Sequence, residues 1–437
     1  MRRRPDNLKP TFLVDSNFLR ALDRWIGVPA CLLVGLWLRL TGRYRAPSGV
    51  PRPRRVVFIA LAEIGALFVA NSAVVQARKR FPDAELYFLT FEAGRPAAEM
   101  LGFEPSHVIT LRPASLPSLA WTMLVAIGAC RRAKIDASVN LEVYVRFSTL
   151  LAALSGARWR AGFHGFHDAG ASLGGLVTQR AVYSPHHHAA VSYMLLVEAL
   201  AESPDAEPRA KIPAKTLPLS PLQLSSTEQS RERIRDIVHD ALPTPAPSLG
   251  RLVILNANAS DLVPVRRWPQ ARYVNLAQRL LERPDVIIVL TGTAAERPGA
   301  TPLAEAIASP RVANLAGRTT LRELIDLFTF ADLMVTNDSG PAHFAGATEL
   351  KTIVLFGPET PRIFGPLGRN QVAIYKGLGC SPCVSVYNRK RSPCGDNRCL
   401  TSIGVEQVFE AAERLLNGES LEREAVRQSC SPSEQDK

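Results

Sequence analysis

A short polar turn at residues 337–341 (NDSGP) brings together a carboxylate, a hydroxyl and a glycine–proline pair. The apolar run Leu333–Val335 before it is typical of a buried strand, and the segment after it favours a helix. Ser339 can cap that helix and Pro341 suits its first turn. The first N–H groups of a helix attract anions, whereas Asp338 would repel a phosphate and accept hydrogen bonds from hydroxyl groups. A phosphate beside a polyol is the chemistry of a sugar nucleotide.

The elements around this turn form a βαβ unit, because Thr352–Phe356 is typical of a second buried strand. Such a unit places its turn at the carboxyl edge of a parallel sheet, where open α/β folds bind ligands. His343, in the first turn of the helix, would either reach a phosphate or cap and pack. The alternative interpretation of the whole stretch is an ordinary α/β turn with a capping serine.

The string NDSGPAHFAGA at 337–347, followed by VLFGPETP and FGPLG, resembles the signature of the family 9 glycosyltransferases, the ADP-heptose:lipopolysaccharide heptosyltransferases. The resemblance is strong over about 251–408 and weaker over about 56–201. It implies an α/β protein of the GT-B fold, with two Rossmann-like domains facing each other across a cleft. It also implies a bacterial, inverting transfer of heptose from ADP-heptose to a lipopolysaccharide-type or other lipid-linked acceptor, with no metal or other cofactor required.

Further donor contacts are expected where strands of the second domain end. Arg266 stands where the family has a lysine two places before Trp-Pro, which implies a diphosphate clamp; the alternative is a solvated surface pair with Arg267. Thr291 and Gly292 follow a strand and are placed to contact a nucleoside, and Glu296 would meet a ribose hydroxyl. The full predicted donor set is Asn256, Arg266, Thr291, Gly292, Glu296, Asp338, Ser339, Gly340, Pro341 and His343.

The expected catalytic base departs from the family pattern. The family usually has Gly-Asp in the turn after the first strand, and that aspartate is taken as the base, but here Gly65 is followed by Ala66. Glu63 is the carboxylate in this turn and is therefore the predicted base, with Asp168 and Glu142 as the next carboxylates to test. Two alternatives stay open: an inactive nucleotide-sugar-binding protein, or an epimerase or hydrolase of sugar nucleotides on the same fold.

Four cysteines form the pattern C-x2-C-x10-C-x4-C near the C-terminus, which is compatible with a structural zinc site but is not a standard spacing. They are Cys380, Cys383, Cys394 and Cys399. Reduced thiols that pack the loop are the other main interpretation, and a cytoplasmic setting disfavours disulfides.

The chain has 437 residues and is 46% hydrophobic, which is enough for two globular domains. Residues 1–55 hold twelve Lys or Arg against three Asp, so they carry +9 of the net charge of +12. The remainder is nearly balanced, which argues against a nucleic-acid groove. The predicted organisation is a basic segment at 1–55, an acceptor domain at 56–202, a linker with a connecting helix at 203–250, a donor domain at 251–417 and a polar tail at 418–437.

The basic segment contains the longest apolar run, WIGVPACLLVGLWL at 25–38, flanked by Arg24 and Arg39. This run is shorter than the roughly 20 residues that a spanning helix needs, and Trp25 and Trp37 suit the interfacial region of a bilayer. We expect a peripheral or monotopic anchor on an anionic membrane, at the cytoplasmic face of the bacterial inner membrane. A soluble core helix and a true transmembrane span are the alternatives.

Deleting residues 1–50 is expected to release the protein from membranes while donor binding persists, because the apolar and basic residues are removed together. Fractionation of cell extracts tests this. Sedimentation of the truncated protein with membranes would place the anchor elsewhere.

Overall fold

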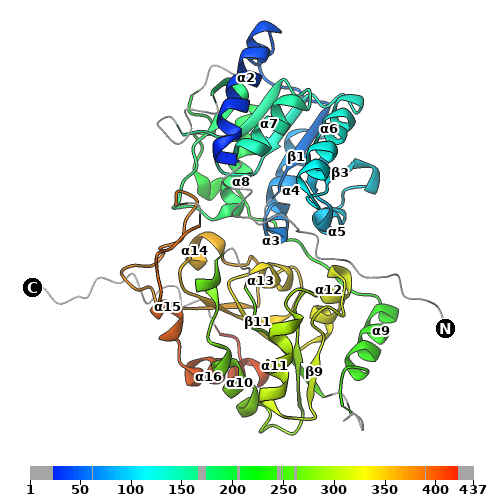
Figure 1. The fold of residues 1–437 in the computed structure, drawn as a ribbon, viewed down its shortest axis with the longest axis vertical. Helices are drawn as coiled ribbons and strands as arrows, with labels where there is room; N and C mark the ends of the chain where they lie inside the picture. The colour runs from blue at the N-terminus through cyan, green and yellow to red at the C-terminus, as the bar shows by residue number, and fades with distance from the viewer. Residues whose placement is uncertain are drawn as a thin grey trace, which may run out of the picture. The chain divides into compact units, whose positions relative to one another are not determined.

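A computed structural model describes residues 23–61, 63–165, 174–203, 207–243, 248, 250–259, 263–388 and 390–421. The chain divides into two compact units, Met1–Ser220 and Pro221–Lys437, each with one six-stranded sheet (Figure 1). Neighbouring strands are parallel throughout both sheets. The prediction of an α/β protein with two parallel sheets is therefore confirmed.

The first sheet has the order β3-β2-β1-β4-β5-β6. Its strands are short apolar runs such as RVVFI in β1, which is buried at every position after the first, as expected for a sheet covered on both faces. The strands are β1 Arg55–Ile59, β2 Glu85–Phe91, β3 Val108–Leu111, β4 Ala137–Asn140, β5 Trp159–Phe163 and β6 Gln179–Ala181.

Helices of the first unit bury their apolar stripes on this sheet. Helices α6 and α7 share one core cluster with β1 and β2, while α8 packs against α4 and against β4, β5 and β6. The helices are α2 Gly27–Leu40, α3 Ile64–Val69, α4 Asn71–Arg80, α5 Arg95–Met100, α6 Leu116–Arg132, α7 Arg146–Leu154 and α8 Ala189–Ala201.

The apolar run of the basic N-terminal segment lies in helix α2, which packs against α7 of the first unit. Cys31 and Leu38 of α2 are buried with Leu150, Ala153 and Leu176 in one cluster. Of the helices that the structure describes, none combines the length and the apolar character needed to cross a bilayer.

The second sheet has the order β12-β11-β10-β7-β8-β9. Its strands are β7 Arg251–Asn256, β8 Val286–Leu290, β9 Val312–Asn314, β10 Leu333–Asn337, β11 Lys351–Phe356 and β12 Gln371–Tyr375. The helices of this unit are α9 Glu228–His239, α10 Gln270–Leu280, α11 Arg297–Ile307, α12 Leu321–Phe330, α13 Gly340–Ala345, α14 Pro361–Phe364, α15 Arg398–Thr401 and α16 Val405–Leu416.

Both sheets have the doubly wound strand order, in which the first strand of the unit lies between the second and the fourth. The direction of winding therefore reverses between β1 and β4 in one unit and between β7 and β10 in the other. Ligands of such sheets bind outside the carboxyl ends of the strands at this switch point. The topology thus predicts one binding position in each unit.

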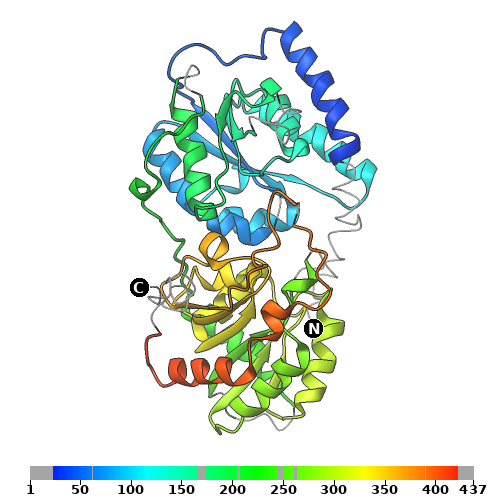
Figure 2. The same cartoon turned by 90° about the vertical axis from the view of Figure 1, so that its left-hand side faces the viewer.

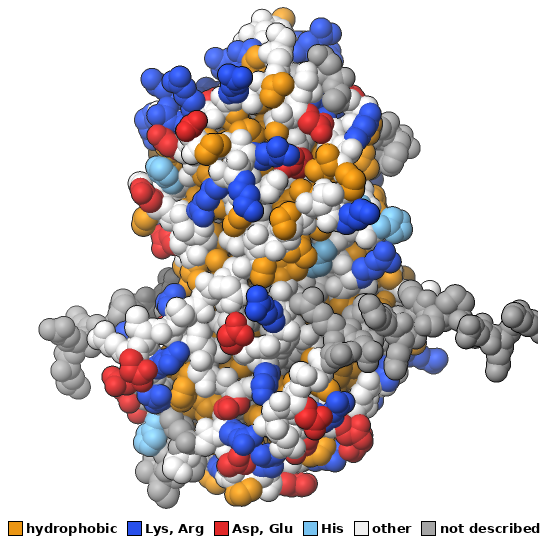
Figure 3. All heavy atoms as spheres, turned by 180° about the vertical axis from the view of Figure 1, so that it is seen from behind, with side chains coloured by type: hydrophobic (Ala, Val, Ile, Leu, Met, Phe, Trp, Pro, Cys, Tyr) orange, Lys and Arg blue, Asp and Glu red, His pale blue; other side chains and the backbone are white. Residues whose placement is uncertain are grey.

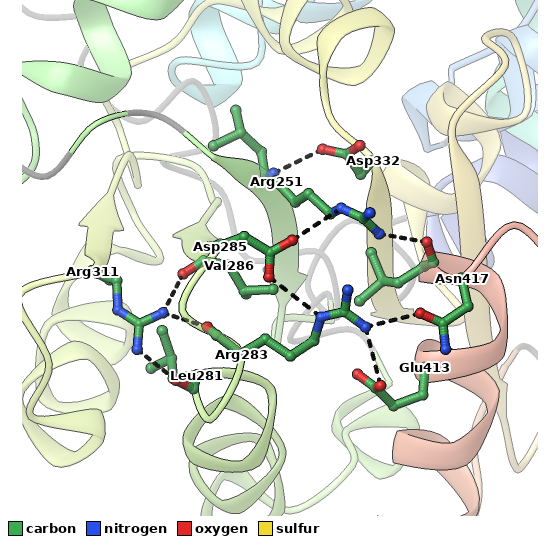
Figure 4. A network of polar contacts seen from close by, with 11 residues as sticks. Arg251, Leu281, Arg283, Asp285, Val286, Arg311, Asp332, Glu413 and Asn417 are labelled. Atoms are coloured by element: carbon green, nitrogen blue, oxygen red, sulfur yellow. Dashed lines mark hydrogen bonds and ion pairs between the residues drawn. The ribbon is translucent and has the colours of Figure 1, made fainter.

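A polar network at the opposite, amino edge of the second sheet holds the helices in place (Figure 4). Arg283 bonds to Glu413 (3.1 Å) and Asn417 (3.0 Å) at the end of α16. The guanidinium of Arg311 donates to the backbone carbonyls of Arg283 (2.6 Å) and Val286 (2.9 Å), and also to that of Leu281. Arg311 therefore fixes the turn that enters β8.

Replacing Arg311 with Ala is expected to lower the free energy of unfolding by about 2 kcal/mol, because carbonyl groups lose a charged hydrogen-bond donor. Denaturant titration measures this change. The exposed Arg318 provides the matched control, and its replacement with Ala should change stability by less than about 0.5 kcal/mol. Equal effects of the two substitutions would show that the Arg311 contacts do not stabilise the unit.

Candidate active site

The side chain of Asn337, fully buried at the end of β10, holds the loop that follows β7. Its Oδ1 accepts hydrogen bonds from the backbone N–H of Trp268 (3.0 Å) and from the hydroxyl of Tyr273 (3.2 Å). Its Nδ2 donates to the carbonyls of Ala257 (3.0 Å) and Asn258 (3.2 Å). One amide therefore ties both ends of this loop to the switch point between β7 and β10.

The loop places Arg266 beside Asp338, the residue that directly follows β10. Arg266 Nη1 lies 3.8 Å from Asp338 Oδ2, and each side chain is only 4% exposed. Arg267 instead donates from Nε and Nη2 to the Ala259 carbonyl (3.0 and 2.7 Å). The alternative of a solvated arginine pair is therefore wrong for Arg266, whose charge is buried next to a carboxylate at the predicted ligand edge.

The turn after β10 differs in one respect from expectation. Ser339 occupies the N-cap position of α13, but its side chain makes no capping bond; its hydroxyl donates to the Asn337 carbonyl instead (3.2 Å). The predicted N-cap position of Ser339 is therefore confirmed without a capping bond from its side chain, and Pro341 lies in the first turn as expected. Helix α13 has only six residues, including the half-buried His343. A helix N-terminus carries roughly half a unit of positive charge, whereas the guanidinium of Arg266 carries a full one.

Asn256 and Thr291 join the carboxyl ends of β7 and β8. Asn256 Nδ2 donates to the backbone carbonyl of Thr291 (3.2 Å) and to its Oγ1 (3.1 Å), and both residues are buried. These side chains hold the strand ends in register. Direct contact of either with a donor stays a prediction.

The loop after β8 is closed by Glu296, whose Oε2 accepts from the backbone N–H (2.7 Å) and the hydroxyl (2.9 Å) of Thr293. Gly292 sits in the same loop, and a Cβ there would lie 2.8 Å from Asn258 Nδ2. A side chain at this position would therefore force the Asn258 amide to move. The predicted ribose contact of Glu296 stays a prediction.

In the first unit, two carboxylates lie at the switch point between β1 and β4. Glu142 follows β4, and its Oε1 accepts a hydrogen bond of 2.6 Å from the backbone N–H of Leu61, just after β1. Glu63 is half-buried at the N-cap position of α3, and its carbonyl accepts from the Ala66 N–H (2.9 Å). Burial raises the pKa of the Tyr193 phenol, and Glu142 and Glu63 both add to that rise. The third predicted carboxylate, Asp168, lies outside the described residues.

Three features of these edges were not predicted from the sequence. Asn337 is the first residue of the motif NDSGPAHFAGA, and its position at the end of a predicted strand could have indicated that it is part of the site. His164 follows β5 and is buried; burial, and then the charge of Arg180, lower its pKa to about 4, so its imidazole is neutral at pH 7. Glu359, after β11, is a carboxylate only 2% exposed.

The four-cysteine loop has mixed surroundings. Cys399 is buried, and burial is the main reason that its pKa is raised to about 11, whereas Cys380 is exposed. Cys383 Sγ lies 3.2 Å from Ser392 Oγ, and Cys394 donates to Asp396 (3.5 Å). Within the described ranges, no three His, Cys, Asp or Glu side chains are arranged to hold a metal ion. The structural zinc stays a prediction.

Replacing Asn337 with Ala is expected to lower the free energy of unfolding by about 3 kcal/mol, because it leaves buried polar groups without a partner. Denaturant titration measures the loss. Asn370, which is half-buried and bonds to Glu349, is the control, and its replacement with Ala should cost under about 1 kcal/mol. A small effect at Asn337 would contradict its role in holding the loop.

Known proteins resemble the chain in sequence over part of its length. Lipooligosaccharide heptosyltransferase 2 of Campylobacter jejuni is 28% identical over 174 residues, which cover 39% of this chain and 53% of that protein. Lipopolysaccharide heptosyltransferase 2 of Escherichia coli K12 is 34% identical over 163 residues, 36% and 44% of the two chains. The matches thus span about half the length of these relatives.

Solved structures agree over most of the chain. The E. coli ADP-heptose lps heptosyltransferase II has a TM-score of 0.65 at 21% identity, with 83% of this chain and 98% of that one covered. A family 9 glycosyl transferase from Veillonella parvula has a TM-score of 0.63 at 19% identity, with 85% and 99% covered. These neighbours support the predicted GT-B type of fold. Residues 129–392 match the family model "Glycosyltransferase family 9 (heptosyltransferase)", and the chain belongs to this family.

Proposed function

We propose that the chain transfers a heptose from ADP-heptose to a lipopolysaccharide-type or other lipid-linked acceptor, with inversion at the anomeric carbon. The observation that carries the proposal is the buried Arg266–Asp338 pair at the switch point of the second sheet, in a chain that belongs to glycosyltransferase family 9. Solved relatives include the E. coli heptosyltransferase WaaC with ADP and with ADP-2-deoxy-2-fluoro heptose, which supports this choice of donor.

The pair suits a donor that carries both phosphates and hydroxyl groups. A guanidinium presents several N–H donors and binds phosphate oxygens through parallel hydrogen bonds, so Arg266 would hold the diphosphate. Asp338 would accept hydrogen bonds from sugar hydroxyls. Because Arg266 offsets its charge at 3.8 Å, this carboxylate repels the anionic donor less than an isolated one would.

The transfer itself needs one base and one stabilised leaving group. In the proposed step, an acceptor hydroxyl oxygen attacks the anomeric carbon as the bond from that carbon to the diphosphate oxygen breaks. The electron pair leaves with ADP, whose new charge Arg266 stabilises, and the hydroxyl proton passes to a carboxylate of the first unit. This division of labour requires no metal ion.

Glu63 is the proposed base, and Glu142 positions the turn that leads to it. Glu142 receives the Leu61 N–H and so fixes the backbone two residues before Glu63. A lipid-linked acceptor places the reaction at the cytoplasmic face of the inner membrane, with the protein held there peripherally.

The proposal is tested with purified protein, a panel of nucleotide sugars and a membrane lipid extract. We expect that ADP-heptose is the one nucleotide sugar of the panel from which the nucleotide is released, as ADP. We also expect that one lipid of the extract gains the mass of one heptose. Donor turnover without a glycosylated lipid would support the epimerase or hydrolase alternative. Donor binding without any turnover would support the inactive alternative.

Replacing Glu63 with Gln is expected to lower the transfer rate at least about a hundredfold, because proton transfer by a placed side chain contributes about 10²–10⁴-fold. ADP-heptose affinity should stay unchanged. The matched variant Glu142→Gln keeps an oxygen that can accept the Leu61 N–H, so its rate should fall by less than about tenfold. Steady-state kinetics of both variants decide the assignment, and a larger loss at Glu142 would make that residue the base.

A further inference from the structure

Helix α2 has two apolar faces, of which only one is covered. Its residues Gly27, Cys31, Gly35 and Leu38 are buried, at the spacing of one helical stripe. The other side of the helix is exposed, and no polar side chain interrupts it between Trp25 and Leu36. Its large side chains, including two from the residues just before α2, are exposed by 38–79%; they are Trp25, Ile26, Leu32, Leu33, Leu36, Trp37 and Leu40. A helix that is apolar all round is expected only where something apolar covers it.

The covered stripe packs against helix α7 of the first unit. Asp23, before the helix, accepts the Phe147 N–H (2.8 Å) and pairs with Arg146 (3.5 Å) at the start of α7. A Cβ at Gly27 would meet the Arg146 side chain at 3.0 Å, so the two helices approach closely. Figures 1 and 2 show α2 on the outside of this unit, beside α7.

A second helix extends the exposed surface. Trp121, Leu124 and Val125 of α6 are exposed by 67%, 64% and 46%, and they lie on one helical stripe that continues to Arg131 and Arg132. The guanidinium of Arg131 lies 5.9 Å from the ring centre of Trp37, so the stripes of α6 and α2 meet there. We name these exposed residues of 25–40 and 116–132 the α2–α6 surface.

Most large exposed hydrophobic side chains of the described residues gather on this surface; outside it are Val50, Val182, Leu219 and Tyr387. Three of the five tryptophans of the chain, Trp25, Trp37 and Trp121, belong to it. By contrast, the face in Figure 3 shows hydrophobic, basic and acidic side chains interspersed over the first unit, in the upper half of the view. An apolar surface of this kind marks a site of interaction.

The charged residues of the α2–α6 surface are all basic. Neither α2 nor α6 contains Asp or Glu, and Asp23, which lies just before α2, is held by Arg146. Exposed arginines border the apolar residues: Arg24, Arg39, Arg43, Arg131 and Arg132. Tryptophans and arginines beside an apolar helix are typical of elements that lie in the interface of an anionic bilayer.

We infer that the α2–α6 surface docks on the anionic bilayer, with α2 lying in the plane of the membrane and α6 inserting beside it. This inference rests on the proposed function, in which the acceptor is lipid-linked. It assigns the contact with the membrane to two helices of the folded first unit. Removal of residues 1–50 would also uncover Leu150, Ala153 and Leu176, so substitutions at exposed positions give the sharper test.

The test uses the full chain with vesicles of phosphatidylcholine alone or mixed with phosphatidylglycerol. The variants L33E/L36E in α2 and L124E/V125E in α6 should each reduce sedimentation with the mixed vesicles at least about fivefold, because charge is placed in the apolar contact. The control V182E, at an exposed apolar position elsewhere, should bind like wild type. Tryptophan emission of wild type should shift to shorter wavelength with mixed vesicles and less with neutral ones.

Normal sedimentation of L124E/V125E would overturn the contribution of α6, and normal sedimentation of both double variants would overturn the inference. A wild-type dimer that both variants dissociate, with vesicle binding unchanged, would make the surface an interface between copies of the chain and also overturn it. Transfer to a water-soluble, delipidated acceptor should be equal in all variants. Absence of that transfer in wild type would overturn the proposed function and leave the vesicle result standing.

Discussion

The donor side of this protein depends on the hydrogen bonds of one buried amide. Asn337 ends β10 and uses both of its side-chain polar atoms to hold the loop between β7 and α10. That loop carries Arg266, and the next residue after Asn337 is Asp338. This amide therefore helps to hold a cation and an anion 3.8 Å apart, at the position where the winding of the sheet reverses and ligands bind.

The first unit uses the same principle with a carboxylate in place of the amide. Glu142 bridges from the end of β4 to the backbone after β1, across the equivalent switch point. Each bridge joins strands that are neighbours in space but distant in sequence, so the site is complete only in the folded sheet. A candidate functional residue lies next to each bridge: Asp338 directly follows Asn337, and Glu63 is two residues after Leu61.

Local patterns in the sequence predicted the two strands beside the turn at 337–341, the turn itself and the parallel sheets, because these depend on apolar runs and on turn residues. Long-range partners were beyond such patterns: Asn337 bonds to Trp268 and Tyr273, 69 and 64 residues away. Glu142 and Leu61 are 81 residues apart. The sequence placed Ser339 at the N-cap position, but it did not show that the hydroxyl is directed to the Asn337 carbonyl and makes no capping bond.

It was equally hard to predict which side chains are buried where neighbouring residues are of the same type. Arg266 and Arg267 are identical in type, yet only Arg266 turns inward beside Asp338. Helix α2 is apolar on all sides, so no periodicity could distinguish its packed stripe from its exposed one. Such choices are made by tertiary contacts, here with Arg146 and Leu150 of α7.

The central claim is that Arg266 holds the diphosphate of the donor while Asp338 holds its sugar. Calorimetric affinities of ADP and ADP-heptose for wild type, Arg266→Ala and Asp338→Ala test it most directly. The account predicts that Arg266→Ala weakens both ligands at least about tenfold, whereas Asp338→Ala weakens ADP-heptose about tenfold and leaves ADP as tight or tighter. Equal losses of ADP and ADP-heptose in folded Asp338→Ala would contradict it.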